Sequence, residues 1–205
     1  MASNSSREIV HIVASLVVLT IAFTYPELRP ELMAIVAFGV GTGFILHELA
    51  HKFTALRYGY VADYEASPTG LFLALGLSFI TGGGFVFAAP GAVMIRGKKA
   101  MYGYYDPVQA KKELAYISIS GAAVNLLLAI IFMAASLYVS SYFTQPLAIK
   151  VLSWAAFINI FLAGFNMIPF GPLDGAKVWR YSPFLWGFAS ILVIILFFIK
   201  TTLIP

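Results

Sequence analysis

The sequence predicts an all-α polytopic membrane protein of about five to six transmembrane helices, and its composition carries that prediction. Of the 205 residues, 60% are hydrophobic and only 11% are charged, whereas about a quarter of the residues of a soluble domain are charged. The net charge of +4 fits the Lys and Arg excess that membrane proteins carry on their cytosolic side. We therefore expect the lipid bilayer, and no nucleic acid, as a partner. The chain contains no cysteine, so a metal site would have to use His and carboxylate ligands.

Five stretches are long enough to cross about 30 Å of hydrocarbon as helices of about 20 residues. They cover about 9–25, 31–57, 113–141, 147–170 and 182–203. We expect the first to be a retained span, because no basic region of a signal peptide precedes it. The chain is then expected to form a single integral membrane domain, 1–205, with a core at about 31–175 and peripheral helices at 9–25 and 182–203.

Segment 69–95 is apolar but does not fit a simple span. Thr81-Gly82-Gly83-Gly84 divides it into pieces of about ten residues, and each piece is too short to cross a bilayer. The second piece, 85–95, is expected to form two short extended runs around Pro90-Gly91. The segment is therefore predicted to be re-entrant or a β-hairpin.

The distribution of basic residues favours the re-entrant alternative. With five crossings, ten of the 13 Lys and Arg residues lie on one side, whereas six crossings divide them eight to five. The positive-inside rule predicts that the richer side, with the N-terminus, is cytosolic. Five crossings also bring the end of the second span and Asp174 to the same membrane face. We expect a multi-pass protein of the cell membrane.

The most specific motif is His47-Glu48-Leu49-Ala50-His51, an HExxH sequence inside the second apolar stretch. Residues i and i+4 share one face of a helix, so His47 and His51 can bind one Zn²⁺ per chain. Glu48 can accept a proton from water at such a metal. The alternative for Glu48 is a paired buried charge that holds helices together.

A catalytic zinc needs a third protein ligand. Asp174 is the candidate, since it follows an apolar helix and a Pro- and Gly-rich break, and irregular backbone at membrane depth must line a buried or watery cavity. A solvated loop acid remains the alternative for Asp174. His11, at the start of the first span, is the other candidate ligand. The other seven acids are expected at solvated loops or helix ends: Glu8, Glu27, Glu31, Asp63, Glu65, Asp106 and Glu113.

Together, HELAH at 47–51 and FNMIPFGPLDG at 165–175 resemble the site-2 protease family of intramembrane zinc metalloproteases, peptidase family M50. Residues 121–125, GAAVN, resemble the small-residue and Asn motif of the helix between them. The resemblance implies His47, His51 and Asp174 as zinc ligands and Glu48 as the general base. It also implies that Asn166 stabilises the oxyanion near the scissile carbonyl.

Three further sequence features have alternative interpretations. Asn125 lies inside a span, where it can shape the substrate site or bridge helices by a hydrogen bond. Gly39-Val40-Gly41-Thr42-Gly43 contains a GxxxG pattern, typical of close helix packing, with room for substrate as the other interpretation. The run 85–95 can serve as an edge strand for an extended substrate, or as a structural hairpin.

The predicted function is therefore an intramembrane zinc metalloendopeptidase that cleaves transmembrane segments of protein substrates. The alternatives are a non-catalytic membrane protein with a structural zinc that binds transmembrane segments, and a metal transporter. The presence of Glu48 argues against the first. The position of the embedded acids at one face argues against the second. The sequence leaves the natural substrate and the oligomeric state open.

Overall fold

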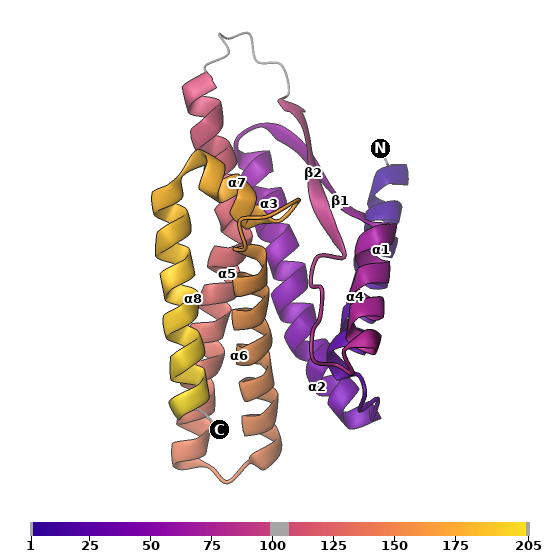
Figure 1. Cartoon of the computed structure of the whole chain (residues 1–205), viewed down its shortest axis with the longest axis vertical. Coiled ribbons are helices and arrows are strands. Elements are labelled where there is room, and N and C mark those ends of the chain that lie inside the picture. Colours follow the sequence, from indigo (N-terminus) through magenta and orange to yellow (C-terminus); the bar gives the residue numbers. More distant parts are fainter. Residues whose placement is uncertain (1, 99–106, 204–205) are drawn as a thin grey trace.

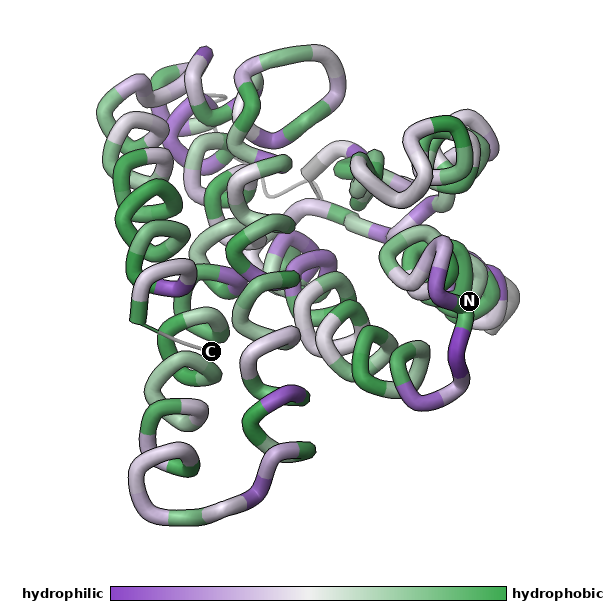
Figure 2. Tube along the Cα trace, turned by 60° about the horizontal axis from the view of Figure 1, so that its bottom comes forward, coloured by the Kyte–Doolittle hydropathy of each residue, from purple (hydrophilic) through white to green (hydrophobic). Residues whose placement is uncertain are grey.

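The computed structural model of the protein describes residues 2–98 and 107–203, and helices dominate it (Figure 1). Within these ranges, five helical segments are long and apolar enough to cross a membrane, which confirms the predicted spans. They are Ser6–Thr24 of α1 (Ala2–Thr24), Pro30–Arg57, α5 (Pro107–Tyr142), α6 (Pro146–Asn166) and α8 (Pro183–Leu203). Hydrophobic residues, in green, predominate along the helical parts of the tube in Figure 2.

The helices form two groups on either side of the motif-bearing segment. Helices α5, α6 and α8 pack together, and α1 packs with α4 (Pro68–Ile80) on the opposite side. The termini lie near opposite ends of the molecule in Figure 1, as an odd number of crossings requires. The fourth span ends at Asn166 rather than near 170, because Pro169, Pro172 and the left-handed Gly171 (φ +59°) do not continue a helix.

The second span is not one uniform α-helix. It consists of α2 (Pro30–Val40), a five-residue π-helix η1 (Gly41–Ile45) and α3 (Leu46–Arg57), which carries the HExxH motif. Short π-helical insertions occur frequently at functional sites. The span packs on α6 through its glycines: a Cβ on Gly39 would lie 2.7 Å from Ile158 Cδ1 and 3.2 Å from Ala155 Cα. The GxxxG pattern therefore serves close helix packing, which is the main source of helix association in lipid.

Segment 68–90 enters the helix bundle and returns. Its two ends are joined by a hydrogen bond of 2.8 Å from Ser67 N to Pro90 O. Its tip reaches the far end of α1, where a Cβ on Gly83 would lie 2.1 Å from Tyr25 O. The segment is therefore re-entrant, with α4 as its descending arm and an irregular chain as its ascending arm.

The sheet differs in detail from the sequence prediction. Strand β2 (Gly91–Lys98) begins at the predicted turn, but residues 85–90 form no strand. The partner of β2 is β1 (Tyr60–Ala66), paired antiparallel with Tyr64 opposite Val93. The sequence did not indicate β1 because Asp63 and Glu65 interrupt its apolar character. The side chain of Tyr64 is nevertheless buried, at 2% exposure.

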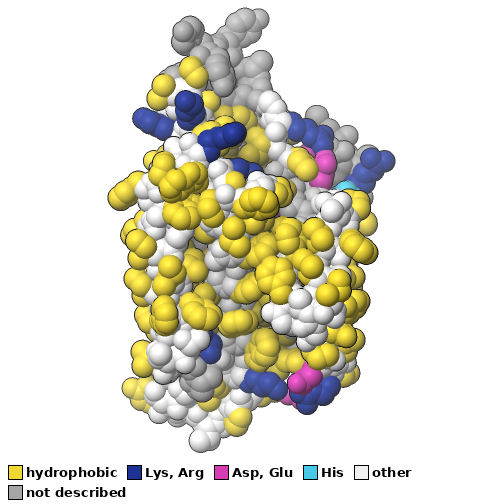
Figure 3. Space-filling model, in the orientation of Figure 1, with side chains coloured by type: hydrophobic (Ala, Val, Ile, Leu, Met, Phe, Trp, Pro, Cys, Tyr) yellow, Lys and Arg dark blue, Asp and Glu magenta, His cyan; other side chains and the backbone are white. Residues whose placement is uncertain are grey.

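Charged residues gather at the two ends of the molecule, and hydrophobic side chains cover the zone between them (Figure 3). At the end opposite the strands, Lys150 Nζ lies 3.5 Å from Glu31 Oε1. Glu113 corrects one expectation: it is only 4% exposed on α5 and accepts a hydrogen bond of 2.8 Å from Tyr60 Oη. A helix-end position did not mean solvation here, since the side chains of Tyr60 and Gln109 both donate hydrogen bonds to this carboxylate.

Substitution of Gly39 by Ala should destabilise the protein by about 1–3 kcal/mol, because the added methyl group overlaps α6. Thermal unfolding in detergent micelles measures the effect. The control is Gly187→Ala on α8, where an added Cβ meets no described atom within 4 Å. The packing account predicts a lower midpoint for Gly39→Ala only, and equal midpoints would contradict it.

Candidate active site

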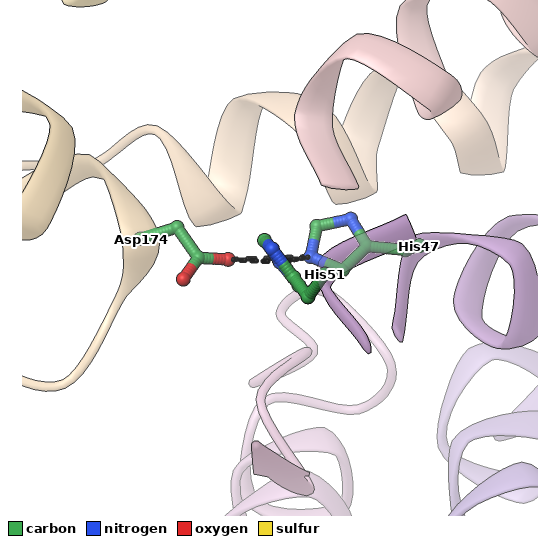
Figure 4. A group of neighbouring side chains, drawn as sticks. All are labelled: His47, His51 and Asp174. Atoms are coloured by element: carbon green, nitrogen blue, oxygen red, sulfur yellow. Dashed lines mark hydrogen bonds and ion pairs between the residues drawn. The ribbon is translucent and has the colours of Figure 1, made fainter. Parts of the chain in front are cut away.

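Three predicted ligand residues meet at one point between α3 and α7 (Asp174–Tyr181), as Figure 4 shows. Asp174 Oδ2 lies 2.8 Å from His51 Nε2 and 3.3 Å from His47 Nε2, and the two Nε2 atoms are 3.0 Å apart. All three residues are buried, at 3–8% exposure. The structure thus brings together side chains that are more than 120 positions apart in the sequence.

The other nitrogen of each histidine ring contacts an oxygen atom. His47 Nδ1 lies 2.5 Å from Asn125 Oδ1, and His51 Nδ1 lies 2.6 Å from Ile117 O, both contributed by α5. Because these oxygens accept hydrogen bonds, they favour rings that carry their proton on Nδ1. Each Nε2 then directs a lone pair towards Asp174, which is the arrangement that outer contacts impose on metal-binding histidines.

Gly121 of α5 makes room for the two rings. A Cβ at this position would lie 2.5 Å from His51 Nε2 and 2.6 Å from His47 Nε2. No real side chain tolerates such distances, so α5 can approach the histidines only with glycine here. The GAAVN segment therefore contributes both the gap and, at Asn125, a hydrogen-bond acceptor.

Asp174 is the first residue of α7 and is positioned by the irregular chain after α6. A Cβ on Gly175 would lie 2.2 Å from Met167 O, so the start of α7 lies directly on the end of α6. Burial raises the pKa of the Asp174 carboxyl, whereas the charge of Lys177, whose Nζ lies 2.9 Å from Asp174 Oδ1, lowers it. This cation favours the ionised carboxyl, the form that binds metals.

The donor set fits a zinc ion. Two Nε2 atoms and a carboxylate oxygen crowd together and need positive charge between them. A proton can serve only one pair of these atoms, whereas a metal ion can bind all three. Two imidazoles and one carboxylate are a known ligand set for catalytic zinc, which keeps a further position open.

Glu48 and a cavity adjoin this site. The cavity has a volume of about 930 Å³, and its lining includes Glu48, His51, Asp174, Asn166 and the first five residues of β2. Glu48 is 9% exposed, and among the described residues its Oε2 has no hydrogen-bond partner. An unpaired carboxylate oxygen at membrane depth is costly, and this pattern is typical of a functional group.

The two predicted asparagines occupy different environments. Asn166 lines the cavity and donates a hydrogen bond of 3.0 Å to Leu162 O within α6. Asn125 is fully buried and bridges helices by hydrogen bonds to His47, Gly43 and Asn159. The helix-bridging interpretation of Asn125 therefore matches its contacts.

Sequence reasoning missed two residues near the site. The Nζ of Lys177 lies 2.9 Å from Asp174 Oδ1, a contact that the spacing of three residues on a helix could have indicated. Asn159 was not considered. Its signal was a polar amide in the middle of an apolar helix. His11 lies away from the metal ligands and accepts a hydrogen bond of 3.4 Å from Ala66 N.

A multi-pass membrane fold with this buried donor set around an HExxH helix defines a zinc metalloprotease. The comparisons with known proteins agree. The signature described as peptidase family M50 matches residues 141–185. A Methanocaldococcus jannaschii protein, named provisionally as a zinc metalloprotease, is 33% identical over 187 residues, which cover 91% of each chain.

A second relative is much longer than this chain. The Mycobacterium tuberculosis protein Rip3, also named provisionally as a zinc metalloprotease, is 28% identical over 142 residues, 69% of this chain and 28% of its own length. No solved structure gives a significant match. The chain belongs to peptidase family M50, the site-2 protease family that its motifs resemble, and it is a zinc enzyme of the membrane.

Replacement of Gly121 by Ala should displace both imidazoles and weaken zinc binding by at least about tenfold. Zinc content after dialysis against a chelator series measures the effect. The matched control is Ala123→Ser, which enlarges an exposed side chain on the same helix. Full zinc retention in Gly121→Ala would show that the positions of the two imidazole rings do not depend on this glycine.

Proposed function

We propose that the protein is an intramembrane endopeptidase that cleaves transmembrane segments of protein substrates, with Glu48 as its general base. One observation carries the proposal: the unpartnered Oε2 of Glu48 belongs to a residue that lines the same cavity as His51 and Asp174. A structural zinc site requires no such carboxylate. A peptidase does, because the attacking water must lose a proton.

The proposed chemistry assigns a step to each polar group. Zinc bound by His47, His51 and Asp174 would acidify water and polarise a peptide carbonyl. Glu48 accepts the proton of the attacking water and then passes it to the leaving amine. Asn166 carries a second amide hydrogen besides the one donated to Leu162 O, and this N–H is the donor that we assign to the developing oxyanion.

The position of the site suits an apolar substrate. The HExxH motif lies within the membrane-length segment Pro30–Arg57, and the cavity walls include Leu73, Phe87, Val93 and Phe170. Side chains of a transmembrane segment can be accommodated there without burial of charge. A helical substrate hides its amide groups in internal hydrogen bonds, so it must become extended before Glu48 and the metal can act.

Strand β2 offers a template for such an extended substrate. Residues 91–95 line the cavity, as do Leu173 and Asp174. In the part of the chain that the structure describes, β1 is the only strand paired with β2. A substrate that adds to the other edge of β2 would gain main-chain hydrogen bonds while its scissile bond faces the metal ligands. This assigns strand addition to β2 rather than to 85–90.

The orientation in the membrane follows from charge. The end of the molecule with the strands carries Arg57, Arg96 and Lys98, whereas Arg29, Lys150 and Lys200 belong to the poorer side of the predicted topology. By the positive-inside rule, we propose that the active site opens towards the cytosolic side of the cell membrane.

Glu48→Gln should abolish the proton transfer but leave the three zinc ligands intact. We expect cleavage of a model transmembrane substrate in detergent to fall by about 10²–10⁴-fold, with zinc content unchanged. Glu65→Gln is the matched control, because that carboxylate also lines the cavity but pairs with Arg96. Equal zinc and equal turnover in Glu48→Gln would remove Glu48 as the base, and absence of turnover in every protein would favour a structural zinc.

Proline scanning of residues 92–95 tests strand addition. Neighbouring residues of a strand direct their N–H groups to opposite edges, so proline should act in two alternating ways. At every second position it removes a bond to β1 and lowers the melting temperature, and at the others it reduces cleavage in a protein of normal stability. Normal cleavage in all stably folded variants would exclude β2 as the template.

A further inference from the structure

The proton position on His47 depends on a side-chain amide, and this distinguishes it from His51. The close partner of His51 Nδ1 is a backbone carbonyl, Ile117 O, which can only accept a hydrogen bond. Ser120 Oγ lies 3.4 Å from the same nitrogen, but its hydroxyl donates to Ile117 O at 2.8 Å. The partner of His47 Nδ1 is the amide of Asn125, which has an acceptor at one end and a donor at the other. A flipped Asn125 would favour a proton on His47 Nε2, and that nitrogen would lose the lone pair that binds a metal.

Two acceptors hold the Asn125 amide in the required orientation. Its Nδ2 lies 3.1 Å from Gly43 O and 2.9 Å from Asn159 Oδ1. Because Gly43 O cannot donate, the end of Asn125 that faces it must be the NH₂ group. The oxygen of Asn125 is then directed to His47.

Asn159 is oriented in the same way, by the backbone of α6. Its Nδ2 donates a hydrogen bond of 2.9 Å to Ala155 O, which can only accept. Its oxygen therefore faces Asn125. The hydrogen bonds form a single directed chain: His47 donates to Asn125, Asn125 to Asn159, and Asn159 to Ala155.

Burial and packing isolate this chain of bonds from water. Asn125 and Asn159 are both 0% exposed, and His47 is 3% exposed. A Cβ on Gly43 would lie 3.2 Å from Asn159 Oδ1 and 2.8 Å from Leu162 Cδ1, so the π-helix η1 approaches the amide at backbone distance. The described lining of the active-site cavity includes neither asparagine, and a substrate in that cavity does not reach them.

We propose that Asn159 is a positioning residue of the metal centre, which acts through Asn125 to keep the His47 proton on Nδ1 and its Nε2 free for zinc. The inference rests on the proposed function, because it takes His47 as a zinc ligand. It adds a requirement on α6, which supplies no zinc ligand.

The test compares two nearly isosteric variants, Asn159→Leu and Asn159→Asp. Leucine removes the acceptor for Asn125. A buried aspartic acid is driven to its neutral form, and its C=O and O–H then replace the C=O and NH₂ of Asn159. We expect zinc affinity to fall by about tenfold or more in Asn159→Leu and to stay close to wild type in Asn159→Asp. The control is Ser136→Ala on α5. It removes a buried hydroxyl that has no hydrogen-bond partner among the described residues.

A spectroscopic measurement separates positioning from general stability. The chain has three histidines, so ¹⁵N-histidine labelling resolves each ring, with His11→Gln for assignment. In zinc-free protein at about pH 8, where histidine is ordinarily neutral, the His47 proton should be on Nδ1 in the wild type and in Asn159→Asp. In Asn159→Leu it should distribute over both nitrogens.

Two results would overturn the proposal: a proton on Nε2 of His47 in the wild type, which requires no variant to fold, or wild-type zinc affinity and tautomer in Asn159→Leu. Failure of the proposed function is distinguishable from both, since it would appear as a wild-type protein that binds no zinc or cleaves no substrate.

Discussion

The structure depends on one contact: an aspartate carboxylate held against two histidine nitrogens inside a membrane-embedded helix bundle. Electron-rich atoms at these separations repel one another unless a positive charge lies between them. Two glycines make their approach possible. Gly121 lets α5 lie against the two histidines of α3, and Gly175 lets the start of α7, with Asp174, lie on the end of α6.

The contact between Asp174 and the two histidines also brings a set of buried polar groups, which have defined hydrogen-bond partners. Inside the hydrocarbon of a bilayer, no water is present to form hydrogen bonds with an unsatisfied polar group. The rings of His47 and His51 therefore have their outer nitrogens bound, by a side chain in one case and by the backbone in the other. Glu48 Oε2 is the exception among these groups. This contrast with its neighbours is the reason why we assign the role of general base to Glu48.

Much of the architecture could be predicted from the sequence because membrane spans are a local property of composition. The HExxH spacing indicated a shared face for its histidines, and the Pro- and Gly-rich break before Asp174 indicated irregular backbone at membrane depth. The count of positive charges favoured five crossings over six, in agreement with the five membrane-length helices among the described residues, since it used the whole chain rather than one segment.

What the sequence could not supply were the pairings between distant elements. Strand β1 has no clear pattern of its own and depends on β2 for its hydrogen bonds. Glu113 is hydrogen-bonded to Tyr60, 53 positions before it in the sequence. The π-helix before His47 lies against α1, α5 and α6, and its glycines alone did not indicate it. The link between Asn159 and His47 could not be predicted, because it runs through the side chain of Asn125 on another helix.

X-ray absorption at the zinc edge on the purified protein tests the central claim most directly. The account predicts about one zinc per chain, bound by two imidazole nitrogens at about 2.0–2.1 Å together with oxygen ligands. A substoichiometric zinc content, or a zinc without two imidazoles in its coordination shell, would contradict the site formed by His47, His51 and Asp174.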